Sequence, residues 1–179
     1  MTRHLTLPNQ LTILRLLLVP LIGYTLSATW PYHDQVSAVV YMSAAATDSL
    51  DGRLARSRHQ VSELGKFLDP LADKVLVITV LAILVGEAVV PFWVVVVIFM
   101  REFVITGLRF VAAGQGVVVS ATPWGKSKTV TQNVMIVLLI LEQPYLVLRP
   151  AALAFVVLAL IATVASGLDY VWRYRRFVI

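Results

Sequence analysis

Four aspartates lie close together in an otherwise apolar chain, and their spacing indicates a shared site. Asp48 and Asp51 are three residues apart, and Asp69 and Asp73 are four apart. Each pair projects from one face of a helix, because the helical repeat brings positions three or four apart into line. Charged side chains are costly in apolar surroundings, so packing alone is a poor explanation for all four.

Carboxylates arranged in this way predict a site for divalent cations. Two consecutive helices joined by a short segment form an antiparallel hairpin, so the two aspartate pairs can converge. Converging carboxylates cannot all stay ionised unless some are protonated or cations lie between them. A site built only from oxygen ligands favours Mg²⁺ or Mn²⁺, with Ca²⁺ also possible. Two such ions close together would suit phosphoryl transfer.

Small and basic residues beside the first aspartate pair indicate a binding surface. Gly52 and Ala55 share the helical face of that pair, and Arg56 follows them directly. Small side chains would let a bulky ligand approach the backbone, and the arginine could bind its phosphate. The alternative is that Gly52 and Ala55 only allow close helix packing.

The composition predicts that these residues belong to a small polytopic membrane protein. Of the 179 residues, 59% are hydrophobic and 14% are charged, and the mean hydropathy is +0.83. So few polar residues cannot cover a water-soluble surface. A membrane-spanning helix needs about 20 residues, so the chain has room for about six or seven spans. We therefore expect an all-α fold and a single domain over residues 1–179. Cysteine is absent, which excludes disulfides and thiol chemistry.

Six apolar stretches can be separated at charges, prolines and aromatic clusters. The predicted spans are residues 9–28, 34–58, 63–86, 90–113, 126–141 and 149–172. Positive charge gathers near the N-terminus, at 53–66, at 126–128 and at 173–176, which predicts that these parts are cytoplasmic. Both termini then lie in the cytoplasm, in agreement with an even number of spans.

The net charge of +5 is explained by this orientation, so no nucleic-acid partner is expected. Aromatic residues near the ends of spans are expected to form a belt at each membrane interface. Trp124, Tyr170 and Trp172 belong to the cytoplasmic belt in this interpretation.

The aspartate motif as a whole resembles a known family signature. The chain is similar to the CDP-alcohol phosphatidyltransferases through the pattern Asp48-x₂-Asp51-Gly52-x₂-Ala55-Arg56-x₈-Gly65-x₃-Asp69-x₃-Asp73, from which no position departs. Further motifs resemble the bacterial members that make phosphatidylglycerophosphate, and this similarity covers about residues 6–172. These motifs are Pro8-Asn9-x-Leu11-Thr12-x₂-Arg15, Leu68-Asp69-Pro70-Leu71-Ala72-Asp73-Lys74, Arg101-Glu102-Phe103, Gly107-Leu108-Arg109 and Gly125-Lys126-x-Lys128-Thr129.

The resemblance implies a reaction and a role for each motif residue. The family transfers a phosphatidyl group from CDP-diacylglycerol to an alcohol and releases CMP. In the suggested members the alcohol is sn-glycerol 3-phosphate and the product is phosphatidylglycerophosphate. Asp48, Asp51 and Asp69 would bind two Mg²⁺ or Mn²⁺ ions, and Asp73 would contribute to the metal site and act as general base. The nucleotide of the donor would be bound by Thr47, Gly52, Ala55, Arg56 and Gly65.

Basic residues outside the motif are candidates for binding the phosphate of the acceptor. Arg101 and Arg109 are eight residues apart, which is about two helical turns and a nearly common face. For Arg101 the alternative is an ion pair with Glu102 or an aspartate. For Arg109, Lys126 and Lys128 it is extension of the side chain to lipid headgroups. The full set of candidates is Arg15, Arg101, Arg109, Lys126 and Lys128.

Other functions stay open at this point. Within the family, a cardiolipin synthase type would use phosphatidylglycerol as acceptor, and another type would use an inositol phosphate. Outside the family, a cation transporter would also place aspartates and arginines in the membrane, but it would not need small residues at these offsets. The resemblance further implies contact with membrane lipid, a homodimer, and a bacterial inner-membrane location with the active site facing the cytoplasm.

Overall fold

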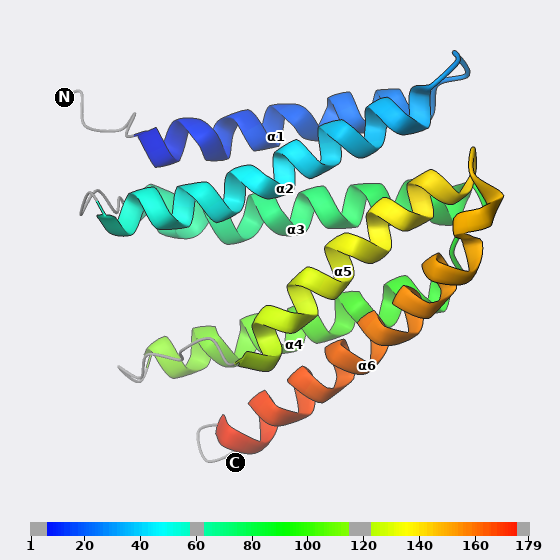
Figure 1. The fold of residues 1–179 in the computed structure, drawn as a ribbon. Helices are drawn as coiled ribbons and strands as arrows, with labels where there is room; N and C mark the ends of the chain where they lie inside the picture. Colours follow the sequence, from blue (N-terminus) through cyan, green and yellow to red (C-terminus); the bar gives the residue numbers. More distant parts are fainter. Residues whose placement is uncertain (1–6, 58–62, 115–122, 175–179) are drawn as a thin grey trace. The chain divides into compact units, whose positions relative to one another are not determined.

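The computed structural model describes residues 7–57, 63–114 and 123–174, and this part of the chain is entirely helical. Over these ranges it forms six α-helices and one short 3₁₀ helix, η1, with no strand (Figure 1). The α-helices are α1 (Leu7–Leu26), α2 (His33–Ser57), α3 (Glu63–Gly86), α4 (Phe92–Gly114), α5 (Pro123–Glu142) and α6 (Arg149–Tyr174), and η1 covers Leu146–Leu148. The all-α prediction is confirmed, and each predicted span matches one helix to within a few residues.

Prolines account for several of the helix starts. Pro8, Pro123 and Pro150 each lie in the first turn of a helix, and Pro91 directly precedes α4. The first turn tolerates proline because its N–H groups have no partner within the helix. α5 therefore begins at Pro123, three residues before the predicted start at Lys126.

The chain divides into two compact units, residues 1–89 and 90–179. In the first unit α1 packs against both α2 and α3, which also contact each other. Its core is apolar, with large side chains supplied by all three helices. The fully buried residues include Ile22 and Leu26 from α1, Tyr41 and Ala44 from α2, and Leu76, Val80 and Leu84 from α3.

The second unit is organised around α6, which packs against both α5 and α4. The buried face of α6 consists mostly of small residues. Its members are Ala152, Val156, Ala159, Ala162, Thr163, Ser166 and Tyr170. Small side chains let helices approach closely where van der Waals contacts and interhelical hydrogen bonds hold them together.

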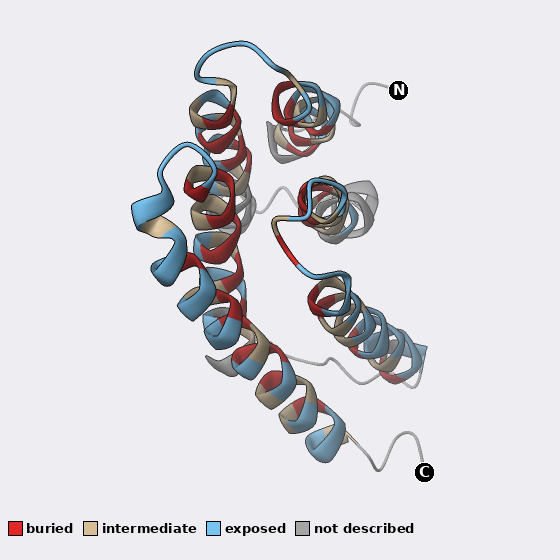
Figure 2. Cartoon of the chain, turned by 90° about the vertical axis from the view of Figure 1, so that its right-hand side faces the viewer, coloured by how far each residue is buried: buried red, intermediate tan, exposed pale blue. Residues whose placement is uncertain are grey.

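The outward faces of the helices are apolar, which reverses the pattern of a water-soluble protein. On α6 the exposed residues include Val157, Ile161 and Leu168, with exposed fractions of 55%, 59% and 66%. Thr163 and Ser166 are buried on the opposite side of the same helix. Figure 2 shows buried residues along one side of α6, the helix that leads to the C-terminus, and exposed residues along its other side. An amphipathic helix in water would bury its apolar side instead.

One helical segment among the described residues, Leu146–Tyr174, is long and apolar enough to cross a membrane by itself. The described part of α1, Gln10–Leu26, is apolar but shorter. α4 has the length of a span but carries Arg101, Glu102 and Arg109 in its interior. The six-span topology with cytoplasmic termini therefore stays a prediction.

Candidate active site

The two aspartate pairs lie on either side of the connection between α2 and α3. Asp48 and Asp51 belong to the last turns of α2, and Asp69 and Asp73 to the first turns of α3. Their backbone is helical at all four positions, as the spacing requires for residues that share a helical face. The convergence of the pairs stays a prediction, because three of the side chains fall outside the part of the chain for which side chains are described.

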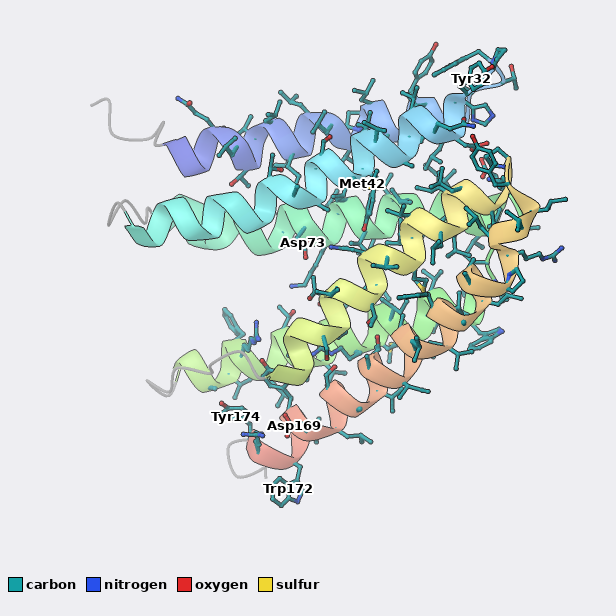
Figure 3. All side chains as sticks on the ribbon, in the orientation of Figure 1. Tyr32, Met42, Asp73, Asp169, Trp172 and Tyr174 are labelled. Carbon is teal, nitrogen blue, oxygen red and sulfur yellow. The ribbon has the colours of Figure 1, made fainter. Side chains whose placement is uncertain are left out.

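Asp73 is the member of the quartet whose side chain the structure describes. It is half-buried on α3 (Figure 3). Its charge lies within range of the buried phenol of Tyr41 on α2, so the described carboxylate lies near the helix that carries the first aspartate pair. Among the described side chains no group of three potential metal ligands is present. The metal site therefore rests on the donor set, which consists of carboxylate oxygens suited to Mg²⁺ or Mn²⁺.

A buried arginine of α1 contacts α2 one helical turn before the first aspartate. Arg15 on α1 is fully buried, and its Nε donates a hydrogen bond to the carbonyl oxygen of Ala44 on α2 at 3.2 Å. The Thr47 hydroxyl donates to the same oxygen at 2.6 Å. Two predicted site residues thus meet on one carbonyl, four residues before Asp48. A direct contact between Arg15 and the acceptor stays a prediction.

The second unit brings three of the predicted acceptor residues together. Glu102 on α4 accepts a hydrogen bond at Oε1 from Nη1 of Arg101 at 2.9 Å, and the same oxygen accepts one from Nζ of Lys128 on α5. The Lys128 side chain is buried. The ion pair between Arg101 and Glu102, considered as an alternative role for Arg101, is therefore present. It includes a second cation from another helix.

Tyr170 on α6 joins the two arginines of α4. Nη2 of Arg109 donates a hydrogen bond to the Tyr170 hydroxyl at 2.7 Å. The guanidinium carbons of Arg101 and Arg109 lie 5.7 Å and 5.2 Å from the centre of the tyrosine ring, within the range of cation–π contacts. We call Arg101, Glu102, Arg109, Lys128 and Tyr170 the cation cluster.

The placement of Tyr170 in an interfacial aromatic belt is wrong. Its side chain is 1% exposed and lies in the packed face of α6, whereas Trp172 is 67% exposed and points away from the helices (Figure 3). The sequence pattern does not separate the two residues, because an aromatic residue near the end of a span fits the belt pattern whether its side chain is exposed or buried. The sequence signal that could have indicated burial is the position of Tyr170 three residues after Gly167, on the face of α6 that carries small residues. In the fold this face packs against α4, which carries two arginines.

The cation cluster has an excess of positive charge. Arg101 and Lys128 contact the Glu102 carboxylate, and Arg109 adds a third cation on Tyr170, so the formal charges of the cluster sum to two positive. In addition, Nε of Arg101 is buried and has no hydrogen-bond partner among the described residues. Partly buried positive charge is stable only with a counter-charge, so the cluster is suited to bind an anion.

For the remaining predicted residues only the backbone is described. Gly52, Ala55 and Arg56 continue α2, Gly65 belongs to the first turn of α3, and Lys126 to the first turn of α5. Their helical placement agrees with the predicted spans. Their contacts with a nucleotide or an acceptor stay predictions.

Comparison with known proteins places this arrangement among enzymes of lipid synthesis. The family model described as CDP-alcohol phosphatidyltransferase matches residues 5–165. A Bacillus subtilis protein named CDP-diacylglycerol–glycerol-3-phosphate 3-phosphatidyltransferase is 40% identical over 178 residues, covering 92% of each chain. A protein of the same name from Salmonella choleraesuis is 36% identical, covering 94% of each chain. A probable phosphatidylglycerophosphate synthase of Mycobacterium tuberculosis is 37% identical, covering 97% of this chain and 84% of its own.

Proposed function

The chain belongs to the CDP-alcohol phosphatidyltransferase family, and we propose that it transfers the phosphatidyl group of CDP-diacylglycerol to sn-glycerol 3-phosphate. The products are phosphatidylglycerophosphate and CMP. The names of the relatives, which match over most of the chain, supply the donor and the acceptor. The observation that carries the choice of a phosphorylated acceptor is the cation cluster, with two positive charges in excess.

The aspartates of α2 and α3 hold divalent metal in this proposal. Asp48, Asp51 and Asp69 bind two Mg²⁺ or Mn²⁺ ions, with Asp73 contributing. Bound metal would neutralise charge on the phosphates of the donor. Oxygen ligands from two consecutive helices fit this role, because such ions prefer carboxylates to other side chains.

Asp73 acts as the general base. It takes the proton of the acceptor hydroxyl while that oxygen forms a bond to the phosphorus on the diacylglycerol side of the donor. The bond from this phosphorus to the oxygen bridging to CMP breaks, and CMP leaves with the electron pair. Its half-buried side chain and its position one turn after Asp69 support this role.

The nucleotide of the donor lies against the last turns of α2. Gly52 and Ala55 let the cytidine approach the backbone, and Arg56 binds its phosphates. Thr47 and Gly65 border this surface. Arg15 supports it from α1, since its hydrogen bond to Ala44 holds the turn that leads into Asp48.

The phosphate of the acceptor binds to the cation cluster. Arg101, Arg109 and Lys128 supply the positive charge, and Lys126 adds to it at the start of α5. Glu102 holds Arg101 and Lys128 in place by accepting hydrogen bonds from both. Binding through these groups would select a phosphorylated alcohol over a neutral one.

The proposed setting is the bacterial inner membrane, with six spans and the active site on the cytoplasmic side. The apolar outward faces of the helices support contact with lipid on several sides. The family match over residues 5–165 runs through both units and supports a single domain over 1–179. A homodimer is part of the proposal because members of the family commonly form one.

The test is release of CMP by the purified chain in detergent with CDP-diacylglycerol, Mg²⁺ and a series of acceptors. We expect release that depends on sn-glycerol 3-phosphate and is abolished by a chelator. Release with phosphatidylglycerol or an inositol phosphate instead would keep the reaction and replace the acceptor. No release with any acceptor, in folded protein supplied with lipid, would overturn the proposal and favour a cation transporter.

A further inference from the structure

We propose that Tyr170 is a positioning residue that fixes Arg101 and Arg109 on one buried ring, so that both can bind the phosphate of the acceptor. The inference rests on the proposed function and extends it to α6, a helix to which the sequence motifs assign no role. Nothing in the aspartate signature or the basic motifs includes this tyrosine.

The hydroxyl of Tyr170 fixes the outer arginine. It accepts a hydrogen bond from Nη2 of Arg109 at 2.7 Å, and the tyrosine itself is 1% exposed. Arg109 is otherwise exposed, so its guanidinium combines a fixed end with access to a ligand. A hydrogen bond to a charged donor is among the stronger ones in proteins.

The ring of Tyr170 and the neighbouring glycine fix the inner arginine. The guanidinium of Arg101 lies over the ring at 5.7 Å from its centre. A Cβ atom at Gly167 would lie 3.3 Å from Cγ of Arg101, so the aliphatic part of this arginine passes closely over the glycine. Gly167 and Tyr170 are three residues apart and face the same way, which gives Arg101 a continuous surface on α6.

Two fixed arginines bind a phosphate better than two mobile ones. An arginine side chain loses considerable rotamer freedom when it is immobilised on a ligand. The contacts of Arg101 and Arg109 with Tyr170 already restrict these side chains in the free protein, so less rotamer freedom is lost when the phosphate binds. The unpartnered Nε of Arg101 leaves a donor for an anion among the described residues. Tyr170 thus affects affinity for the acceptor phosphate, while the transferred group and the base are untouched.

The experiment compares Tyr170→Phe and Tyr170→Leu with the wild type in steady-state kinetics. Phenylalanine keeps the ring and removes the hydroxyl, so we expect KM for sn-glycerol 3-phosphate to rise about tenfold. Leucine removes both contacts, so we expect a rise of about a hundredfold. KM for CDP-diacylglycerol and kcat at saturating acceptor should stay within about twofold of the wild type. The reason is that the variants lose contacts that stabilise the bound acceptor equally in the ground state and in the transition state.

Inorganic phosphate provides a second readout that a loss of stability would not move. It should compete with sn-glycerol 3-phosphate, and its inhibition constant should rise in the same order across the two variants. Trp172→Phe is the matched control, since this aromatic residue lies on the same helix and is 67% exposed. We expect its kinetics and phosphate inhibition to equal those of the wild type.

A glycine pair tests the contact with Arg101 separately. Gly167→Ala should raise KM for the acceptor about threefold, because the arginine must shift by a few tenths of an ångström. Gly86→Ala at the end of α3 is the control, since a Cβ there meets nothing within 4 Å.

The outcomes separate the inference from the function on which it rests. Wild-type protein without release that depends on sn-glycerol 3-phosphate would overturn the function. Active wild type with unchanged acceptor KM and phosphate inhibition in Tyr170→Leu would overturn the role of Tyr170. Equal rises in KM for donor and acceptor would also overturn it, because they would indicate a general disturbance of the fold.

Discussion

At the scale of single residues, the second unit concentrates its polar contacts on a few side chains. One oxygen of Glu102 accepts from Arg101 and from Lys128, which joins α4 to α5. One hydroxyl of Tyr170 accepts from Arg109, which joins α4 to α6. We therefore expect a change at either acceptor to affect the packing of helices and, in the proposed function, the binding of the acceptor phosphate.

Replacing Glu102 by glutamine should show this double effect. Glutamine leaves Arg101 and Lys128 without a negative partner, and a hydrogen bond to a charged group contributes about 1.5–3 kcal/mol. We expect a lower Tm in detergent and KM for sn-glycerol 3-phosphate raised about tenfold. Thermal unfolding and acceptor titration measure the two effects. Glu87→Gln, at an exposed position after α3, is the control. Wild-type values of both Tm and KM in Glu102→Gln would contradict the role of this carboxylate.

Replacing Asp73 by asparagine should separate chemistry from folding. The amide keeps the shape of the side chain but cannot take the proton of the acceptor. We expect kcat to fall about 10²- to 10⁴-fold, with Tm and binding of Mn²⁺ retained in part. CMP release, thermal unfolding and Mn²⁺ titration measure these quantities. A variant that turns over at the rate of the wild type would exclude Asp73 as the base.

The residue patterns predict charged groups better than they predict their partners. The spacing of the aspartates and of Arg101 and Arg109 follows from helical periodicity, and α2, α3 and α4 confirm that periodicity. Tyr170 is different, because an aromatic residue near a helix end fits both an interface with lipid and a packed core. Only the side of α6 that faces α4 decides between the two, and this depends on packing between helices remote in sequence.

At the scale of helices, α6 shows best how the fold is held together. Its small residues face α5 and α4, and its large apolar residues face outward. The sequence predicts the bounds of this helix closely because Pro150 begins it and a basic tail follows. The orientation of its two faces follows from which side carries the small residues, a rule that applies to helices in lipid.

A lysine on the outward face of α6 should distinguish lipid from water around this helix. Ile161 is 59% exposed near the middle of α6. In lipid a charge there costs about 3 kcal/mol, so Ile161→Lys should reduce the folded, membrane-inserted fraction strongly. Val171→Lys is the matched control, because a lysine near the end of the helix can extend to the headgroups. Fractionation of membranes and size-exclusion chromatography in detergent measure the outcome. Equal, wild-type yields of both variants would show that this face does not contact lipid.

At the scale of the whole molecule, each unit consists of helices gathered around one of the chain's two terminal helices. α1 packs against both partners in the first unit, and α6 does so in the second. Stability therefore depends on many close contacts between helices and on a few buried polar groups. Where such a group is titratable, its burial also makes the stability depend on pH.

Glu142, the last residue of α5, should make the stability of the protein depend on pH. Burial raises the pKa of its carboxyl above the ordinary value, and the charge of Arg149 opposes this in part. A raised pKa in the folded state favours folding below the unfolded pKa, and this contribution is lost as pH rises through the folded pKa. We expect Glu142→Gln to have a higher Tm than the wild type at about pH 8, and a smaller advantage at about pH 4.

The measurement is Tm in detergent across this range for the wild type, Glu142→Gln and Arg149→Gln. Removing Arg149 removes the opposing charge, so the loss of stability in Arg149→Gln should extend to higher pH and be larger than in the wild type. Parallel curves for the wild type and Glu142→Gln would contradict the assignment of this pH dependence to Glu142.

The hydrogen bond between Arg109 and Tyr170 spans 61 residues, and this separation orders events during synthesis. α4 leaves the ribosome with Arg101 and Glu102 already adjacent, so one ion pair can form inside that helix alone. Arg109 gains its tyrosine partner only when α6, which follows α5 along the chain, has been made. In the proposed membrane setting, α4 therefore completes its polar contacts only after α6 has been made. A chain that stalls before residue 170 would leave the Arg109 guanidinium without this hydrogen bond and without the tyrosine ring beside it.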